Sequence, residues 1–130
     1  MLGGMLRKGY YSSYGPYARY VLENLRADKA FLGVDAANQE TGVTNAALEE
    51  VPIKQTMIEV SREIIMVTDS TKFDTCVPYR VCGWEKIDQV ITDDGVSQDY
   101  LDFFQQRGIK VTLVQPLGEE EDALQLPERE

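Results

Sequence analysis

An acid, two hydroxyls and an ammonium follow closely on one of the most apolar stretches of this chain. The run IIMV at residues 64–67 precedes a polar group made of Asp69, Ser70, Thr71 and Lys72. Carboxylates accept hydrogen bonds from sugar hydroxyls, and a lysine ammonium suits phosphate as a point charge. Together, such side chains could bind a small polyhydroxylated anion, for instance a sugar phosphate.

Two other apolar runs also close on an aspartate. Residues 30–34 lead to Asp35, and residues 87–92 lead to Asp93. Because ligands of open parallel sheets bind outside the carboxyl ends of the strands, we expect Asp35, Asp69 and Asp93 at one edge of a sheet. An aspartate after a strand also starts turns and caps helices, and this structural alternative holds for each residue taken alone.

The segments around these runs have the apolar periodicity of helices. Helices are predicted at residues 16–25, 52–60 and 96–104, and a last strand at residues 109–114. Residues 36–48 are polar and predict a loop. Strands that alternate with helix-sized segments indicate βαβ units. The expected fold is therefore α/β, a mostly parallel sheet with helices on both faces.

Length and composition indicate one ordinary domain. The chain has 130 residues, of which 43% are hydrophobic and 27% charged. No apolar run approaches the ~20 residues that span a bilayer, and residues 1–11 lack the apolar core of a secretory signal, so a cytoplasmic location is expected. With Cys76 and Cys82 as the only cysteines and no histidine, a structural zinc site is disfavoured, and no metal or cofactor is predicted.

The net charge of −9 is concentrated at the carboxyl end. We expect a folded body over residues 1–116 and an acidic, disordered tail over residues 117–130. The tail holds one base, Arg129, and the acids Glu119, Glu120, Glu121, Asp122, Glu128 and Glu130. Nucleic-acid binding requires a basic patch, so this chain by itself should bind DNA poorly.

Several motifs resemble the C-terminal effector domain of the DeoR family of bacterial transcriptional repressors. They are LGGMLR at 2–7, YGPYARYVLENLRADKAFLGVD at 14–35, ETGVTN at 40–45, LEEVPIKQTMI at 48–58, DSTKF at 69–73 and IDQVITDDG at 87–95. The resemblance covers residues 2–114, and the order and spacing of its separate motifs make it specific.

The resemblance implies a Rossmann-like sensor domain, similar in fold to ribose-5-phosphate isomerase and glucosamine-6-phosphate deaminase. Members of the family sense phosphorylated sugars or related metabolites, and the effector changes the DNA affinity of an N-terminal winged helix-turn-helix. By analogy, Asp35 and the loop after it would face the sugar, Lys72 would reach the phosphate, and Lys54 would line the same cleft. The remaining expected contacts at the cleft edge are Ser70, Asp69 and Asp93.

This chain departs from the family pattern at its beginning. No winged helix-turn-helix, strand or phosphate-cradling turn precedes LGGMLR, so the sequence reads as part of an effector domain, with DNA contacted only through a missing domain. An exposed sheet edge and a homo-oligomer are expected.

Three alternatives remain at this point. An isomerase- or deaminase-like enzyme would need a group that titrates near neutrality; the chain has no histidine, although a carboxylate could serve. An oligomerisation module that binds no effector is the second. A phosphoacceptor domain ranks last, because its acids stand in the wrong order along the chain.

Overall fold

The computed structural model describes residues 2–115 of the chain. Its strands are β1 (Met5–Arg7), β2 (Ser12–Tyr14), β3 (Ala27–Gly33), β4 (Ala36–Asn38), β5 (Gly42–Asn45), β6 (Ser61–Val67), β7 (Tyr79–Cys82), β8 (Gln89–Asp93) and β9 (Lys110–Val114). The helices are α1 (Pro16–Glu23), α2 (Val51–Val60) and α3 (Gln98–Gln106), with short 3-10 turns η1 (Leu48–Glu50), η2 (Ser70–Lys72) and η3 (Trp84–Lys86). The three predicted helices and the four predicted strands are confirmed to within a few residues.

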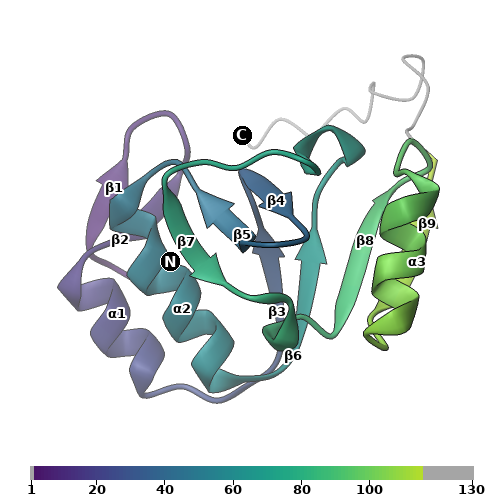
Figure 1. The fold of residues 1–130 in the computed structure, drawn as a ribbon. Coiled ribbons are helices and arrows are strands. Elements are labelled where there is room, and N and C mark those ends of the chain that lie inside the picture. Colours follow the sequence, from purple (N-terminus) through teal and green to yellow (C-terminus); the bar gives the residue numbers. More distant parts are fainter. Residues whose placement is uncertain (1, 116–130) are drawn as a thin grey trace, which may run out of the picture.

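The main sheet is parallel, with strand order β3-β6-β8-β9 (Figure 1). In the register, Gly33 at the end of β3 pairs with Val67 at the end of β6, and Val67 pairs with Ile91 in β8. The carboxyl ends of the three strands therefore meet at one edge. Asp35, Asp69 and Asp93 follow or close these strands at that edge, as the sequence predicts.

One face of this sheet carries the core. Alternate residues of the strands are buried there, and they join the inward sides of α2 and α3 in one cluster. The sheet contributes Ala30, Leu32, Ile64, Met66 and Val90 to this cluster. An aromatic group completes it, in which Phe104 lies 5.2 Å from Trp84 and 5.9 Å from Phe73, measured between ring centroids.

The opposite face has no helix over it in the part of the chain that the structure describes. On that face Ile65 is buried, but Phe31 and Val67 are 60% and 41% exposed. The expectation of helices on both faces is therefore wrong for residues 2–115. The reason is topological: the chain passes from β3 to β6, β8 and β9 in one direction, and right-handed crossovers then place every connection on the same side (Figure 1).

A second, antiparallel sheet of order β4-β5-β7 lies over the core face. It corrects the prediction of a loop at residues 36–48. The segment is polar in composition yet closely packed, because Asn38 Oδ1 accepts hydrogen bonds from the amides of Glu40 and Thr41 and so closes the turn between β4 and β5. Gly42 follows at φ 80, where a Cβ would lie 2.4 Å from the Cys82 carbonyl oxygen. Only glycine fits there.

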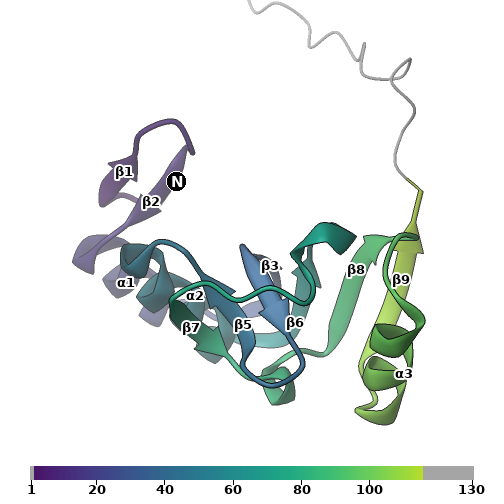
Figure 2. The ribbon, with the colours of Figure 1, turned by 45° about the horizontal axis from the view of Figure 1, so that its top comes forward.

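A small hairpin, β1–β2, precedes α1 at the end of the molecule opposite to α3 (Figures 1 and 2). Its strands are short and contain no fully buried residue. The hairpin leads into α1 through Gly15, with Pro16 at the first helical position as predicted. Helix α1 packs against α2 rather than over the sheet. No helix within residues 2–115 is long and apolar enough to cross a membrane.

Candidate functional site

A pocket of about 600 Å³ opens beside the carboxyl end of β3. Its walls come from the β1–β2 hairpin, α1, the end of β3, η1 and α2. We call it the β3 pocket, and it is lined by Leu2, Arg7, Tyr10, Ser12, Ser13, Leu22, Gly33, Val34, Asp35, Glu50, Ile53, Lys54 and Met57. Two of the six predicted effector-binding residues, Asp35 and Lys54, are thus brought together.

Lys54 ties the end of β3 to the end of β5. Its ammonium lies 2.9 Å from the Gly33 carbonyl oxygen and 2.5 Å from Asn45 Oδ1. Burial lowers the pKa of Lys54, against the opposing influence of the Asp35 and Glu50 carboxylates. Two of the three ammonium N–H groups are therefore used to hold the pocket wall.

Asn45 and Glu50 continue this network. Asn45 is fully buried, and its amide donates to the Ala47 carbonyl at 3.0 Å and to Glu50 Oε2 at 3.2 Å. Glu50 Oε1 accepts from Arg7 at 2.8 Å and from Ser12 Oγ at 3.3 Å. Burial alone would raise the pKa of Glu50, but the hydrogen bonds from Arg7 and Asn45 outweigh it, and the pKa lies below its usual value. Glu50 is accordingly an ionised acceptor.

Asp35 occupies the mouth of the β3 pocket. It is exposed, and its Oδ2 accepts a hydrogen bond of 2.8 Å from the Ala46 amide, just past β5. The same hydrogen bond joins the residue before β4 to the residue after β5, so both ends of the β4–β5 hairpin lie beside the end of β3. The other carboxylate oxygen has no hydrogen-bond partner among residues 2–115, so it can accept a bond from a ligand hydroxyl.

The other four predicted site residues form a second group, which we call the β6–β8 rim: Asp69, Ser70, Lys72 and Asp93. Asp93 Oδ2 accepts from the Ser70 amide at 2.7 Å, and Oδ1 accepts from the Gly95 amide at 2.9 Å. Bonds from Ser70 lower the pKa of Asp93. The rim residues line no part of the β3 pocket.

Asp69 has a similar local role at the start of η2. Its Oδ1 accepts hydrogen bonds from both the hydroxyl and the amide of Thr71, the amide at 3.0 Å, and the hydroxyl contact lowers the pKa of Asp69. These are the contacts of a turn-capping aspartate. The contacts of Asp69 are thus those of its own turn, and Asp93 joins its turn to the start of η2.

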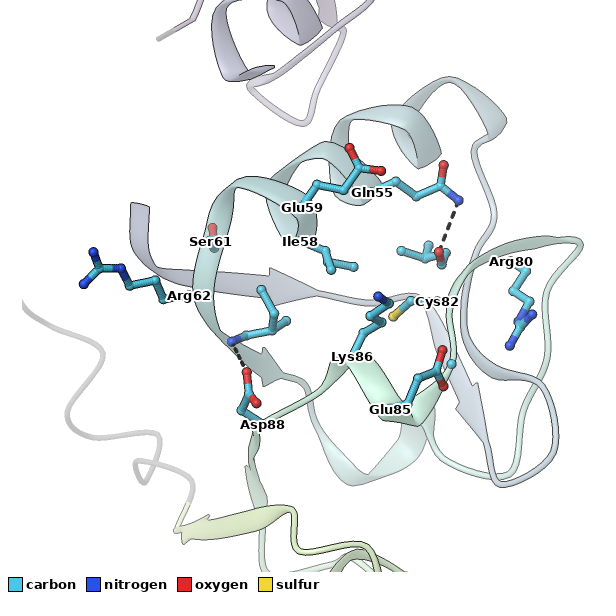
Figure 3. A pocket seen from close by; sticks show the side chains of 13 residues that line it. Gln55, Ile58, Glu59, Ser61, Arg62, Arg80, Cys82, Glu85, Lys86 and Asp88 are labelled. Atoms are coloured by element: carbon cyan, nitrogen blue, oxygen red, sulfur yellow. Dashed lines mark hydrogen bonds between the residues drawn. The ribbon is translucent and has the colours of Figure 1, made fainter. Parts of the chain in front are cut away.

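A larger cleft, of about 790 Å³, lies at the amino-terminal end of β6, away from the predicted site (Figure 3). Its polar groups are partly engaged with the backbone: Gln55 donates to the Val81 carbonyl, and Asp88 accepts from the Ile64 amide. Figure 3 shows Arg62 pointing away from the cleft. Burial raises the pKa of the Cys82 thiol there to about 11, so it is not a nucleophile at neutral pH. None of the six predicted effector-binding residues lines this cleft.

Metal binding finds no support in residues 2–115, where no group of three or more Cys, Asp or Glu side chains is arranged to hold an ion.

Arg7 and Glu50 were not among the predicted site residues. Their contact joins positions 43 residues apart in the chain, and no local sequence pattern predicts it.

Comparison with known proteins agrees with this architecture. Residues 1–94 match the family model described as the DeoR C terminal sensor domain. The chain is 39% identical over 114 residues to a proposed aga operon transcriptional repressor of Escherichia coli O157:H7, and 34% identical over 113 residues to a proposed sgc region transcriptional regulator of Escherichia coli K12. It is 29% identical over 115 residues to the HTH-type transcriptional repressor GlcR of Bacillus subtilis.

These alignments take in most of this chain but less than half of each relative. They cover 88%, 87% and 88% of the chain, and 42%, 44% and 44% of the three relatives in the same order. The predicted family resemblance is thereby confirmed, in the C-terminal portion that carries the sensor. The chain belongs to the DeoR C-terminal sensor domain family of transcriptional regulators.

Proposed function

We propose that this chain is the effector-sensing part of a transcriptional regulator of carbohydrate metabolism and binds a phosphorylated sugar or a related metabolite in the β3 pocket. The observation that carries the proposal is the grouping of two cations and two carboxylates around one cavity: Arg7, Lys54, Asp35 and Glu50. Carboxylates suit hydroxyls and cations suit an anionic group, so the lining has both kinds of partner that such a ligand needs.

The pocket also lies where a ligand could influence several elements. It is bounded by the hairpin, α1, α2 and the end of β3, and α1 packs on α2. A ligand that prefers one arrangement of these elements shifts the population toward it. In a complete regulator this shift would alter DNA binding by another domain through coupling of the two sites.

A sensing role is favoured over catalysis by the state of the pocket groups. Glu50 has a lowered pKa and accepts three hydrogen bonds, which is unlike a general base that titrates near neutrality. Lys54 is held by two acceptors. The relatives quoted above are named as regulators of transcription.

A thermal-shift screen tests the proposal. A bound ligand at 100 times its dissociation constant stabilises the fold by about 2.7 kcal/mol, so sugar phosphates should raise the melting temperature measurably. Asp35→Asn should weaken the response. Asp28→Asn is the matched control, because the Asp28 side chain is 88% exposed and lies outside the pocket.

Two results would count against the proposal. If no sugar phosphate shifts the melting temperature, an oligomerisation role without effector binding is favoured. If ribose 5-phosphate or glucosamine 6-phosphate is converted to product on incubation, the chain is an enzyme.

A further inference from the structure

The two cations that line the β3 pocket differ in how much of their hydrogen-bonding capacity is still free. Lys54 has three N–H donors and gives two of them to Gly33 and Asn45. Moving its ammonium toward a ligand would leave Oδ1 of the fully buried Asn45 without its donor. Lys54 is therefore a poor candidate for the principal contact to an anion.

Arg7 is the opposite case. A guanidinium has five N–H donors in a planar fork, and within the described residues Arg7 uses one of them, on Glu50 at 2.8 Å. Its side chain is 28% exposed. The guanidinium carbon lies 4.0 Å from the centroid of the Tyr10 ring, which holds the fork over an aromatic face.

Glu50 does not depend on Arg7 alone for its hydrogen bonds. Ser12 and Asn45 also donate to its carboxylate, at 3.3 and 3.2 Å. The guanidinium can therefore share its donors with an incoming anion while Glu50 keeps two partners. Bidentate pairing with phosphate or carboxylate is the geometry to which an arginine fork is suited.

We propose that Arg7 is the anion-binding side chain of the β3 pocket, and that the β1–β2 hairpin which carries it responds directly to the ligand. This inference rests on the proposed function and deepens it, because it assigns the ligand's phosphate or other anionic group to Arg7. Arg7 then bridges the ligand and Glu50, and the ligand adds to the contacts that already join the hairpin to η1.

The test is calorimetric titration of the full chain with each sugar phosphate that stabilises it, with the unphosphorylated parent sugar, and with inorganic phosphate alone. Arg7→Gln should weaken the phosphorylated ligand about tenfold or more, because a charge-assisted hydrogen bond is lost, and change the parent sugar by less than about threefold. Arg7→Lys should fall between, since a point charge replaces the fork.

Arg19→Gln is the matched control, because Arg19 pairs with Glu23 on the exposed side of α1 and lines no part of the pocket. Glu50→Gln is the second variant: it leaves Arg7 in place and removes the carboxylate that competes for it, so the preference for the phosphorylated ligand over its parent sugar should rise. This variant reports on the inference even if Arg7→Gln does not fold.

The outcomes separate the two proposals. If the wild-type chain prefers phosphorylated ligands and Arg7→Gln keeps that preference, or loses affinity equally for both forms, the assignment of Arg7 is overturned and the sensing role stands. If Glu50→Gln lowers the preference for the phosphorylated ligand over its parent sugar, the assignment is likewise overturned. If the wild-type chain binds no anionic ligand, both proposals fall.

Discussion

The β3 pocket and the β6–β8 rim share one edge of the parallel sheet, but the pocket depends more on contacts between segments that are distant in the sequence. In the rim, Asp69 accepts from Thr71 and Asp93 from Gly95, each two residues away in the chain, and one longer contact joins Asp93 to the Ser70 amide across 23 residues. In the pocket, Arg7 reaches Glu50 across 43 residues, and Lys54 reaches Gly33 across 21. Asp69 thus serves its own turn and Asp93 joins its turn to η2, whereas the cavity with mixed charges is held by several contacts between segments that are distant in the sequence.

The first way to test this comparison is to remove the central cation of the pocket. Lys54→Met leaves the Gly33 carbonyl and the buried Asn45 side chain without their donor, and an unpaired buried polar group costs about 1–3 kcal/mol. Urea unfolding should show that loss. Lys29→Met, at a side chain that is 56% exposed, should change stability by less than about 0.5 kcal/mol. Equal effects of the two variants would mean that the Lys54 network contributes nothing to the fold.

The rim should respond to substitution in stability but not in binding. Asp93→Asn keeps one acceptor oxygen and loses the other, so either the Ser70 or the Gly95 amide loses its partner and the free energy of unfolding should fall. Ligand affinity, measured by titration, should stay within about threefold of wild type. A loss of affinity without a loss of stability would place Asp93 in the effector site instead.

Acid should weaken both regions. The pKa values of Glu50, Asp69 and Asp93 lie below their ordinary values of 4.5, 3.8 and 3.8. A carboxylate with a lowered folded-state pKa stabilises the fold fully above its unfolded pKa, and that stabilisation is lost as pH falls through the folded value. The urea midpoint should therefore be steady near neutrality and fall as the pH drops below about 4.5.

Two variants divide this acid response between the regions. Glu50→Gln should remove the contribution of the pocket and Asp69→Asn one of the two contributions of the rim, each making the decline below pH 4.5 less steep. A wild-type midpoint that rises in acid would contradict the assigned direction of all three pKa values.

The smallest effect is expected at Lys72. It lies at the end of η2 and lines no part of the β3 pocket, so Lys72→Ala should change affinity for a phosphorylated ligand by less than about threefold. A much larger loss, confined to phosphorylated ligands, would support the role that the sequence suggests for Lys72 and would join the rim to the site.

The sequence predicts the elements of the parallel sheet well because their pattern is local. Apolar runs and helical spacing indicate β3, β6, β8 and β9 and the three helices, and the parallel order then brings the strand-end aspartates to one edge. The β4–β5–β7 sheet escapes prediction because Thr44 and Asn45 are polar yet buried. Their hydrogen bonds reach partners such as Ala36 and Lys54, and no sequence pattern shows these pairings.

For the same reason, the sequence predicts only some of the residues that form the site. Asp35 and Lys54 belong to motifs that resemble the family and both line the pocket. Arg7 and Glu50 escape prediction because an isolated arginine in a glycine- and tyrosine-rich segment, or a glutamate before a helix, has many ordinary explanations, such as pairing with the helix dipole. Their role is visible only once the hairpin is folded against η1.

The open face of the main sheet has a consequence for handling the protein. Phe31 and Val67 expose apolar surface there, while the chain carries a net charge of −9 that keeps copies apart in dilute buffer. Added salt shortens the range of that repulsion, from about 10 Å at 0.1 M to about 3 Å at 1 M, and leaves the apolar attraction intact. We expect light scattering to show copies of this polypeptide clustering as ionic strength rises, and Phe31→Ser to delay the onset.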